Sequence, residues 1–217
     1  MDKERINEMK YDVVIVASGK GERAKLGYNK AFFKMKDGRT VLETSASLFI
    51  NDDDCKNVIV VTNREYFNEV FNNSKVKVVE GGKERRDSVY NGLKQVNSDY
   101  VLIHDAARPF LNIESLNELK KELVNKDAVI LAKKAIDTIK VVDNNRILRT
   151  IDRNTIYMAE TPQGFKTSLI KDCYERCEDV NFTDDASLLE SLGYDVYVVE
   201  DRFNNKKLTR EEDFINL

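Results

Sequence analysis

Residues 11–23 read YDVVIVASGKGER, a short apolar run that leads directly into a glycine-rich turn. The run at 11–17 is rich in β-branched residues, which is typical of a buried parallel strand. Because glycine has no Cβ, backbone N–H groups around Gly19 and Gly21 can approach a phosphate closely. The turn lacks the Gly-Lys-Ser/Thr of a P-loop and the third glycine of a dinucleotide fingerprint. It is therefore either a phosphate loop of another kind or a plain glycine turn.

The alternation of apolar runs with helical patterns continues along the chain. The order β-α-β-α-β-α-β-α-β predicts parallel strands joined by crossover helices. The expected strands are residues 11–17, 57–62, 76–80, 100–105, 128–132 and 195–200. The expected helices are residues 40–50, 64–71, 87–96, 113–124, 169–177 and 184–192. Near residue 209, Thr209 and Glu212 match a capping box.

Residues 138–151 interrupt this alternation with a hairpin pattern. Two short β runs flank Asp143-Asn144-Asn145, and these are residue types that favour tight turns. The hairpin is either an ordinary edge hairpin or a projecting arm of about residues 136–155. We predict a single α/β domain over residues 1–217, with a Rossmann-like, mostly parallel sheet flanked by helices and a projecting β arm.

Composition excludes several kinds of site and partner. The chain has 35 Lys+Arg and 38 Asp+Glu, a net charge of −3, and a single histidine. A metal site built from several histidines is impossible within one chain, and the balanced charge argues against a nucleic-acid partner. There is no apolar run of membrane-spanning length and no secretory signal. With Cys55, Cys173 and Cys177 in no disulfide-framework spacing, we expect a cytoplasmic protein without a membrane partner.

Two polar clusters follow predicted strands. Residues 81–88, GGKERRDS, come after the third strand and open a helix. The glycine pair before the helix start suits backbone contact to a ligand. The alternative is a simple glycine turn, with Asp87 or Ser88 as the helix cap. After the fourth strand, Asp105 is well placed for a divalent cation or a sugar hydroxyl, and Arg108 for a phosphate. His104 points to the opposite side of that strand, which favours a packed structural residue over a base.

Later clusters complete the pattern at residues 152–153, 161–163, 183–185 and 204–209. Residues 183–185 also have the form of a helix N-cap, and a lysine pair such as 206–207 is usually solvated. Several basic or small polar clusters, most of them near strand ends, together indicate a polyanionic ligand such as a nucleoside triphosphate.

In this order, the clusters resemble the 2-C-methyl-D-erythritol 4-phosphate cytidylyltransferase family of the non-mevalonate isoprenoid pathway. The segments are ASGKGER with Lys30, GGKERRDSVYNGL, VLIHDAARPF, DTIK, TPQGF, TDDASLLESLGY and NNKKLTREEDF. Asn29 stands where the family usually has proline. The alternatives are the related ribitol-5-phosphate cytidylyltransferases and a catalytically silent nucleotide-binding homologue. The forms HDAAR and GGKERRDSV favour the erythritol family.

The resemblance implies a fold of the nucleotidyltransferase type and a reaction of CTP with methylerythritol 4-phosphate, aided by Mg²⁺. The triphosphate would be wrapped by Ala17, Ser18, Gly19 and Gly21. Cytosine would be recognised by Gly82, Ser88 and Ala106. The sugar phosphate would be held by Asp105, Arg108, Thr138, Thr161 and Thr183, and Asp105 would also belong to the CTP site and ligate the metal.

The resemblance also assigns the four basic residues of the chemistry. Arg23 and Lys30 would stabilise charge at the α-phosphate, and Arg153 and Lys207 would position the attacking phosphate. The β arm would build a homodimer and carry Arg153 into the partner's site. Because the attacking phosphate oxygen is already anionic, this reaction would need fixed cations and no general base.

Overall fold

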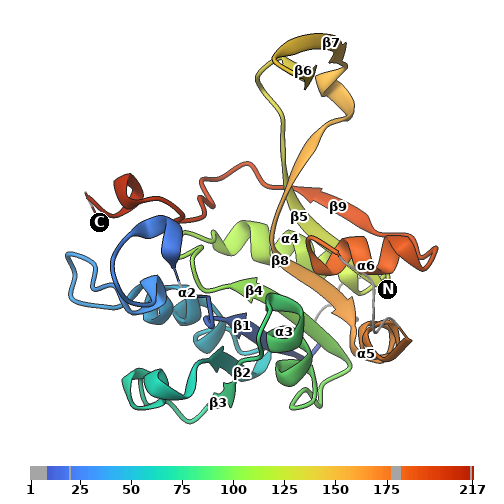
Figure 1. Ribbon diagram of the computed structural model, residues 1–217. Helices are drawn as coiled ribbons and strands as arrows, with labels where there is room; N and C mark the ends of the chain where they lie inside the picture. Colours follow the sequence, from blue (N-terminus) through green and yellow to red (C-terminus); the bar gives the residue numbers. More distant parts are fainter. Residues whose placement is uncertain (1–8, 20, 177–181, 216) are drawn as a thin grey trace.

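A seven-stranded sheet forms the centre of the computed structural model, which describes residues 9–19, 21–176, 182–215 and 217 (Figure 1). The strand order is β3-β2-β1-β4-β8-β5-β9. The strands are β1 (Tyr11–Val16), β2 (Cys55–Thr62), β3 (Val76–Glu80), β4 (Tyr100–Asp105), β5 (Ala128–Lys134), β8 (Tyr157–Lys166) and β9 (Tyr197–Glu200). All of these run parallel except β8, which is antiparallel to β4 and β5. The predicted mostly parallel α/β sheet is confirmed.

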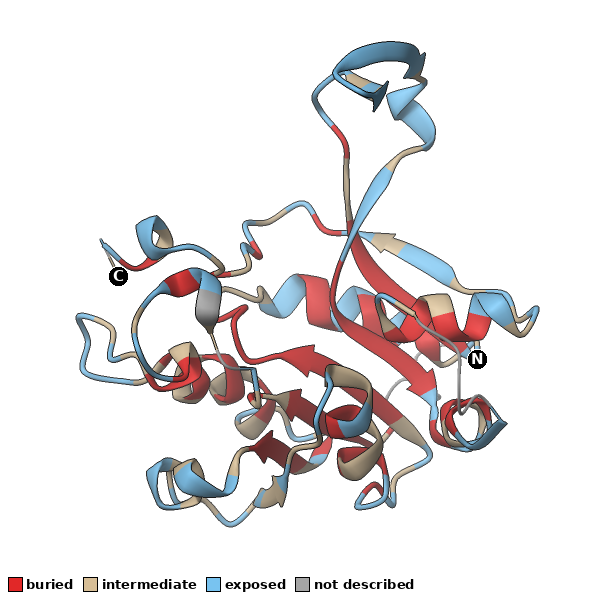
Figure 2. Ribbon diagram, in the orientation of Figure 1, coloured by how far each residue is buried: buried red, intermediate tan, exposed pale blue. Residues whose placement is uncertain are grey.

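Helices cover both faces of the sheet. They are α2 (Val41–Ile50), α3 (Arg85–Leu93), α4 (Ile113–Leu123), α5 (Thr167–Arg176) and α6 (Asp185–Ser191). Val13 and Ile15 of β1 belong to the core shared with α2 and α4, whereas Val14 belongs to the core shared with α3, α5 and α6. Because successive strand residues point to opposite faces, one apolar run fills both cores. Figure 2 shows these central strands as buried.

Strand β8 was not predicted, because its sequence contains a proline and a glycine that normally mark loops. Pro162 lies where the pairing with β5 shifts register, a position that does not require its missing N–H. Gly164 is needed for packing, since a Cβ there would lie 2.8 Å from Leu123 of α4 and 2.9 Å from Leu102 of β4. Burial of Glu160 through Phe165 therefore stabilises a strand where local sequence signals a break.

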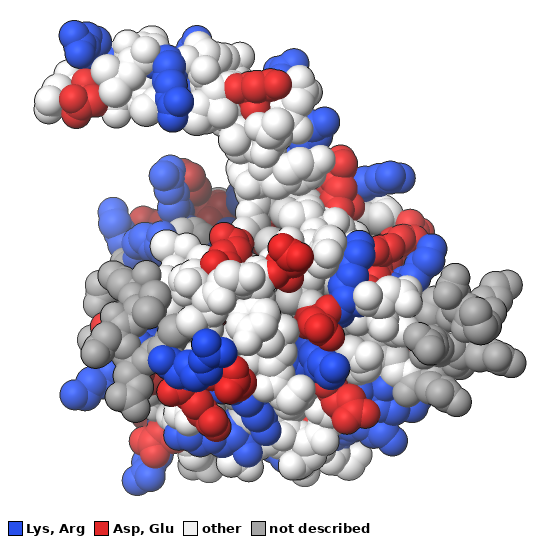
Figure 3. Space-filling model, turned by 90° about the vertical axis from the view of Figure 1, so that its right-hand side faces the viewer, with Lys and Arg blue, Asp and Glu red and all other residues white. Residues whose placement is uncertain are grey.

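The predicted hairpin forms a projecting arm (Figures 1 and 3). Its strands β6 (Ile139–Asp143) and β7 (Arg146–Ile151) form a sheet of their own. Asn144 and Asn145 both have positive φ, at 46° and 63°, which matches the two-residue turn favoured in hairpins. Figure 3 shows the arm standing away from the body, with charges of both signs interspersed on this face.

Two local predictions were wrong, and one predicted helix has different bounds. Where an α-helix was predicted at residues 64–71, the chain forms a 3₁₀ helix, η3 (Arg64–Glu69), which has no fully buried residue to stabilise an α-helix by packing. Helix α3 begins at Arg85 instead of residue 87, because Glu84 is its N-cap and the Glu84 N–H donates to Asp87 Oδ2. Asp213, and not Glu212, accepts the N–H groups of Thr209 and Arg210 ahead of the short helix η5 (Glu211–Phe214).

The described helices include none with the length and apolar character needed to span a bilayer. Cys55 and Cys173 are buried, and Cys177 lies outside the described residues.

Candidate active site

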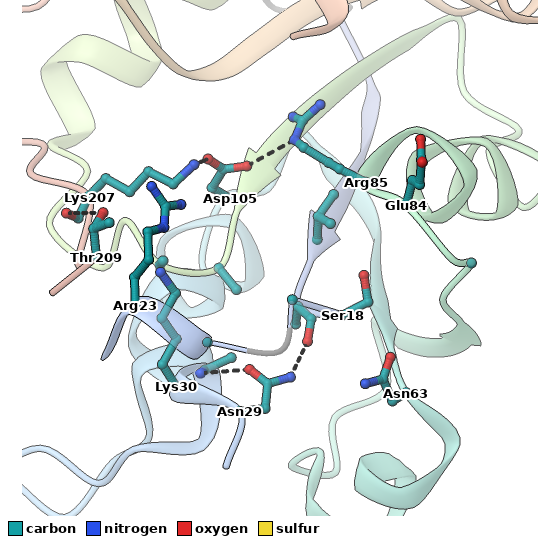
Figure 4. Close-up of a pocket in the computed structure, with 18 of the residues that line it drawn as sticks. Ser18, Arg23, Asn29, Lys30, Asn63, Glu84, Arg85, Asp105, Lys207 and Thr209 are labelled. Carbon is teal, nitrogen blue, oxygen red and sulfur yellow. Dashed lines mark hydrogen bonds and ion pairs between the residues drawn. The ribbon is translucent and has the colours of Figure 1, made fainter. Parts of the chain in front are cut away.

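The main pocket lies where the strand order reverses, between β1 and β4. Val16 and Asp105 are register partners at the carboxyl ends of these two strands, so the loop after β1 and the loop after β4 start side by side. This is the position at which open α/β sheets bind ligands. The cavity has a volume of about 810 Å³ (Figure 4). Ten of the predicted site residues line it: Ala17, Ser18, Gly19, Gly21, Arg23, Lys30, Gly82, Asp105, Ala106 and Lys207.

The glycine-rich loop folds over the segment that carries Lys30. Gly21 has a φ of +67°, and a Cβ there would lie 3.3 Å from the Tyr28 carbonyl oxygen and 3.4 Å from the Lys30 nitrogen. Glycine is therefore required at this position both for its conformation and for the close approach of the backbone. Lys30 begins the 3₁₀ helix η2 (Lys30–Phe32), which places its side chain in the pocket.

A second loop closes the pocket from the side of β3. Gly81 and Gly82 bring this loop against Ser18, and a Cβ on Gly81 would lie 2.6 Å from the Ser18 Cβ. The Ser88 hydroxyl is hydrogen-bonded to the Ser18 hydroxyl at 2.7 Å and accepts the Gly82 N–H at 3.0 Å. Ser88 itself is fully buried and does not line the cavity. Its position joins the two loops, and its predicted contact with cytosine stays a prediction.

Cationic side chains dominate the pocket. Arg23, Lys30, Lys83, Arg85 and Lys207 line it together with two carboxylates, those of Glu84 and Asp105. Burial, with the nearby charges of Lys207 and Arg23, lowers the pKa of Lys30 to about 8. A protein with a net charge of −3 thus presents a locally positive cleft, which suits an anionic ligand.

An alternating chain of charges runs from the pocket into the protein. Lys207 Nζ lies 2.5 Å from Asp105 Oδ2, Arg85 Nε lies 3.5 Å from Asp105 Oδ1, and Arg85 also pairs with Asp185 at 2.8 Å. Burial alone would raise the pKa of Asp105, but Lys207 and Arg85 outweigh it and hold this pKa well below its usual range. Asp105 is therefore ionised and holds Lys207 toward the pocket floor (Figure 4).

The segment after β9 closes the pocket on the remaining side. The Leu208 N–H donates to the Ala107 carbonyl at 2.8 Å, and the Leu208 carbonyl accepts from Lys30 Nζ at 2.6 Å. Through these bonds the segment places Lys207 beside Lys30 (Figure 4), although the two residues are far apart in sequence.

His104 is buried and uncharged. Its Nε2 lies 3.1 Å from the Arg108 carbonyl oxygen, which can only accept, so Nε2 carries the ring hydrogen. Nδ1 therefore accepts from the Thr161 hydroxyl, at 3.1 Å. Burial lowers the pKa of His104 to about 4, which keeps the ring neutral near pH 7. The interpretation of His104 as a packed, hydrogen-bonded residue is confirmed.

Five other predicted residues do not line the cavity. Arg108 and Thr161 are buried beside it, Thr138 and Arg153 are exposed on the arm, and Thr183 is exposed just before α6. The Arg108 guanidinium donates to the Asn205 carbonyl at 2.6 Å and lies 3.6 Å from Glu160. The assignment of these five residues to substrate stays a prediction.

Sequence reasoning missed several lining residues. Arg85 is the first residue of α3, in the charged run that opens this helix, but nothing local in that run indicates its buried partner Asp185. Asn29 is a short polar residue beside Lys30, and its contacts arise only in the folded chain. The other missed side chains with polar groups are those of Asn63, Lys83, Glu84 and Thr209.

The sheet, the glycine-lined cationic pocket and the comparisons with known proteins together define a nucleotidyltransferase. Residues 11–216 match the family model described as 2-C-methyl-D-erythritol 4-phosphate cytidylyltransferase. The chain belongs to this family.

Individual relatives agree with the family model. The chain is 40% identical to the 2-C-methyl-D-erythritol 4-phosphate cytidylyltransferase of Halalkalibacterium halodurans, over 95% of both chains. It is 42% identical to that of Dictyoglomus thermophilum, over 93% of this chain and 92% of the relative. The solved structure of 4-diphosphocytidyl-2C-methyl-D-erythritol synthase from Anaerococcus prevotii matches with a TM-score of 0.84 and 29% identity, over 98% and 96% of the two chains. The Francisella tularensis cytidylyltransferase matches with a TM-score of 0.82 and 31% identity, over 94% and 96%.

Proposed function

We propose that this chain joins CTP and 2-C-methyl-D-erythritol 4-phosphate to give CDP-methylerythritol and pyrophosphate. The observation that carries the proposal is the convergence of Arg23, Lys30 and Lys207 on one glycine-lined pocket. An oxygen of the substrate phosphate attacks the α-phosphorus of CTP, and the bond to the β-phosphate oxygen breaks in line. The nucleophile is already an anion, so the protein must overcome charge repulsion and need not remove a proton.

The fixed cations have different roles in this reaction, according to where they lie in the pocket. Arg23 and Lys30 follow the glycine-rich loop, where the triphosphate would lie, and they would stabilise charge that develops at the α-phosphate. Lys207 lies beside them, is held by Asp105, and would orient the incoming phosphate. These groups are in place before the reaction, which is the condition under which charge stabilisation is most effective.

Magnesium is part of the proposal, and the donor set fits an ion that arrives with the triphosphate. Among the described residues there is no group of three or more His, Cys, Asp or Glu side chains that could hold a metal. Magnesium usually keeps several waters and takes one or two carboxylates together with substrate phosphates. Asp105 would be the protein ligand, and it would give up part of its pairing with Lys207 or Arg85. When bound, the ion would neutralise charge on the phosphate oxygens.

Pyrophosphate release tests the proposal. The purified chain is assayed with CTP and magnesium, and with either methylerythritol 4-phosphate or ribitol 5-phosphate. Turnover that prefers the first polyol phosphate is expected. A preference for ribitol 5-phosphate would reassign the substrate, and CTP binding without release of pyrophosphate from either mixture would identify a silent homologue.

His104→Gln is expected to keep turnover close to that of the wild type. The neutral ring is turned to the Arg108 carbonyl and to Thr161, and a glutamine side chain can also donate and accept. The rate constant kcat and the binding of CTP are measured on folded protein. Loss of turnover with CTP binding intact would instead indicate that His104 is a general base.

The arm supplies the proposed homodimer contact. Its exposed apolar side chains, together with those at its base, are Ile136, Val142, Ile147, Leu148, Tyr157 and Met158. Clustered exposure of this kind marks an interaction surface. In this chain Arg153 is exposed and its guanidinium donates to the Ile136 carbonyl, at the base of the arm. The family resemblance implies that Arg153 acts in the partner's site, and its position on the arm, outside the pocket lining of its own chain, is compatible with this role.

Mixing two variants of low activity tests this arrangement. Arg153→Ala and Lys30→Ala chains, each weakly active alone, are unfolded, mixed in equal amounts and refolded. Random pairing gives mixed dimers with one complete site, so about a quarter of wild-type activity is expected. The formation of mixed dimers is verified by mass spectrometry with one chain tagged. Mixed dimers without restored activity would contradict a shared site.

A further inference from the structure

Asn29 is a buried polar residue between two parts of the proposed phosphate site. Only 4% of it is exposed, whereas the preceding Tyr28 is 43% exposed. On one side lies the glycine-rich loop after β1, and on the other lies η2, which begins with Lys30. Burying an amide is unfavourable unless its hydrogen bonds are made, so its partners indicate why it is retained there.

The Asn29 side chain joins these two parts directly (Figure 4). Its Nδ2 donates to the Ala17 carbonyl at 2.5 Å, and its Oδ1 accepts from the Ala31 N–H at 3.0 Å. The first bond fixes the chain where the glycine-rich loop leaves β1. The second caps η2 and therefore fixes the backbone of Lys30.

The backbone of Asn29 is held as well. Its N–H donates to the Tyr66 hydroxyl at 3.0 Å, and its carbonyl accepts from the Phe32 N–H at 3.0 Å. The Tyr66 ring stacks on Phe32, with ring centroids 4.6 Å apart and nearly parallel planes. The Ala17 carbonyl also accepts from Thr62 of β2, at 3.1 Å. Asn29 is thus fixed from β1, from η3 and from η2 at the same time.

We propose that Asn29 is a positioning residue, which holds the glycine-rich loop and the Lys30 amine at a fixed separation through Ala17 and Ala31. This inference rests on the proposed function, in which the loop binds the triphosphate and Lys30 stabilises charge at the α-phosphate. Lys30 is a long, flexible side chain, and its Nζ is held at its far end by the Leu208 carbonyl. Fixing its backbone as well confines the amine to the place where charge develops.

Asn29→Ala is expected to lower kcat by about 100-fold, the loss typical of a misplacement of about 1 Å at a reacting centre. The KM for CTP should change much less, because the glycine-rich loop and the other cations of the pocket remain. The matched control is Asn112→Ala. Asn112 caps α4 through the same kind of bond, to the Glu114 N–H at 2.8 Å, and α4 lies against the sheet outside the pocket lining.

Kinetics and urea unfolding are measured for the wild type and both variants. Loss of kcat in Asn29→Ala, with a normal kcat in Asn112→Ala, supports positioning. An unchanged kcat in folded Asn29→Ala overturns it, and so does an equal loss of kcat in the control. A wild type that releases no pyrophosphate would instead refute the proposed function, so the two failures are distinguishable.

A milder variant decides the question if Asn29→Ala does not fold. Tyr66→Phe keeps the ring stacked on Phe32 and removes only the acceptor of the Asn29 N–H. Loss of one hydrogen bond corresponds to about a two- to tenfold effect, so a decrease of kcat within this range is expected, again with little change in the KM for CTP. An unchanged kcat in this variant would overturn the inference.

Discussion

Replacing Lys30 with alanine is expected to lower kcat by about 10²–10³-fold, the range found when one preorganised group that stabilises developing charge is removed. The Lys30 amine is half-buried, beside Arg23 and Lys207, and is held by the Leu208 carbonyl. Water that filled the place of the amine would supply neither its positive charge nor a hydrogen-bond donor held in a fixed direction. The loss should therefore appear mainly in kcat, measured by pyrophosphate release at saturating CTP and methylerythritol 4-phosphate.

The pH dependence of the wild type gives a second readout of Lys30. Its pKa is lowered to about 8, so the amine is charged below this pH and loses its charge as the pH rises through it. The ratio kcat/KM for CTP, which reports the free enzyme, should therefore decline above about pH 8. This decline should be absent in Lys30→Ala.

Lys34→Ala is the matched control for both measurements. Lys34 lies four residues further along the chain and is exposed, outside the pocket lining. It should keep the wild-type kcat and the decline at high pH. Turnover unchanged in Lys30→Ala would remove Lys30 from the chemistry.

Arg85→Met is expected to cost about 3–5 kcal/mol of unfolding free energy, the range for removing one partner of a buried ion pair. The Asp185 side chain is completely buried and pairs with Arg85 at 2.8 Å. Without Arg85, Asp185 would keep the Tyr174 hydroxyl but lose its charge partner. For a chain of this size, each kcal/mol corresponds to about 2–4 °C in Tm.

Urea and thermal unfolding measure this loss. Arg64→Met removes the same charge from an exposed pair with Glu80 and should change stability little. In an Asp185→Asn background the buried charge is gone, so Arg85→Met should cost much less there. Equal costs for Arg85→Met and Arg64→Met would contradict the assignment of a buried pair.

The sequence was sufficient to predict the parallel sheet and the place of the pocket. The apolar runs identify the strands because strands buried on both faces carry few polar residues. Once β1 and β4 are recognised as parallel neighbours, the loop at Gly19 and the carboxylate of Asp105 must lie together. The asparagine pair of the arm likewise predicts its turn from local conformation alone.

The remaining features depend on contacts between distant segments. Strand β8 exists because neighbouring strands bury it, whereas its local sequence, with Pro162 and Gly164, reads as a loop. The roles of Asn29 and Arg85 come from Ala17 and Asp185, which lie 12 and 100 residues away along the chain. No periodicity or spacing in one sequence indicates such pairs.

The segment that bears Lys207 has a consequence for synthesis on the ribosome. A growing chain makes Gly19, Lys30 and Asp105 early, and all seven strands are complete at residue 200. Lys207 and Leu208, which face Asp105 and Lys30, emerge only afterwards. The end of a chain leaves the ribosome only when synthesis is finished, so the site can be completed only after the whole chain has been released. A chain cut before residue 207 would still contain the sequence of every strand but would lack the groups that pair with Asp105 and Lys30, so it is expected to release no pyrophosphate.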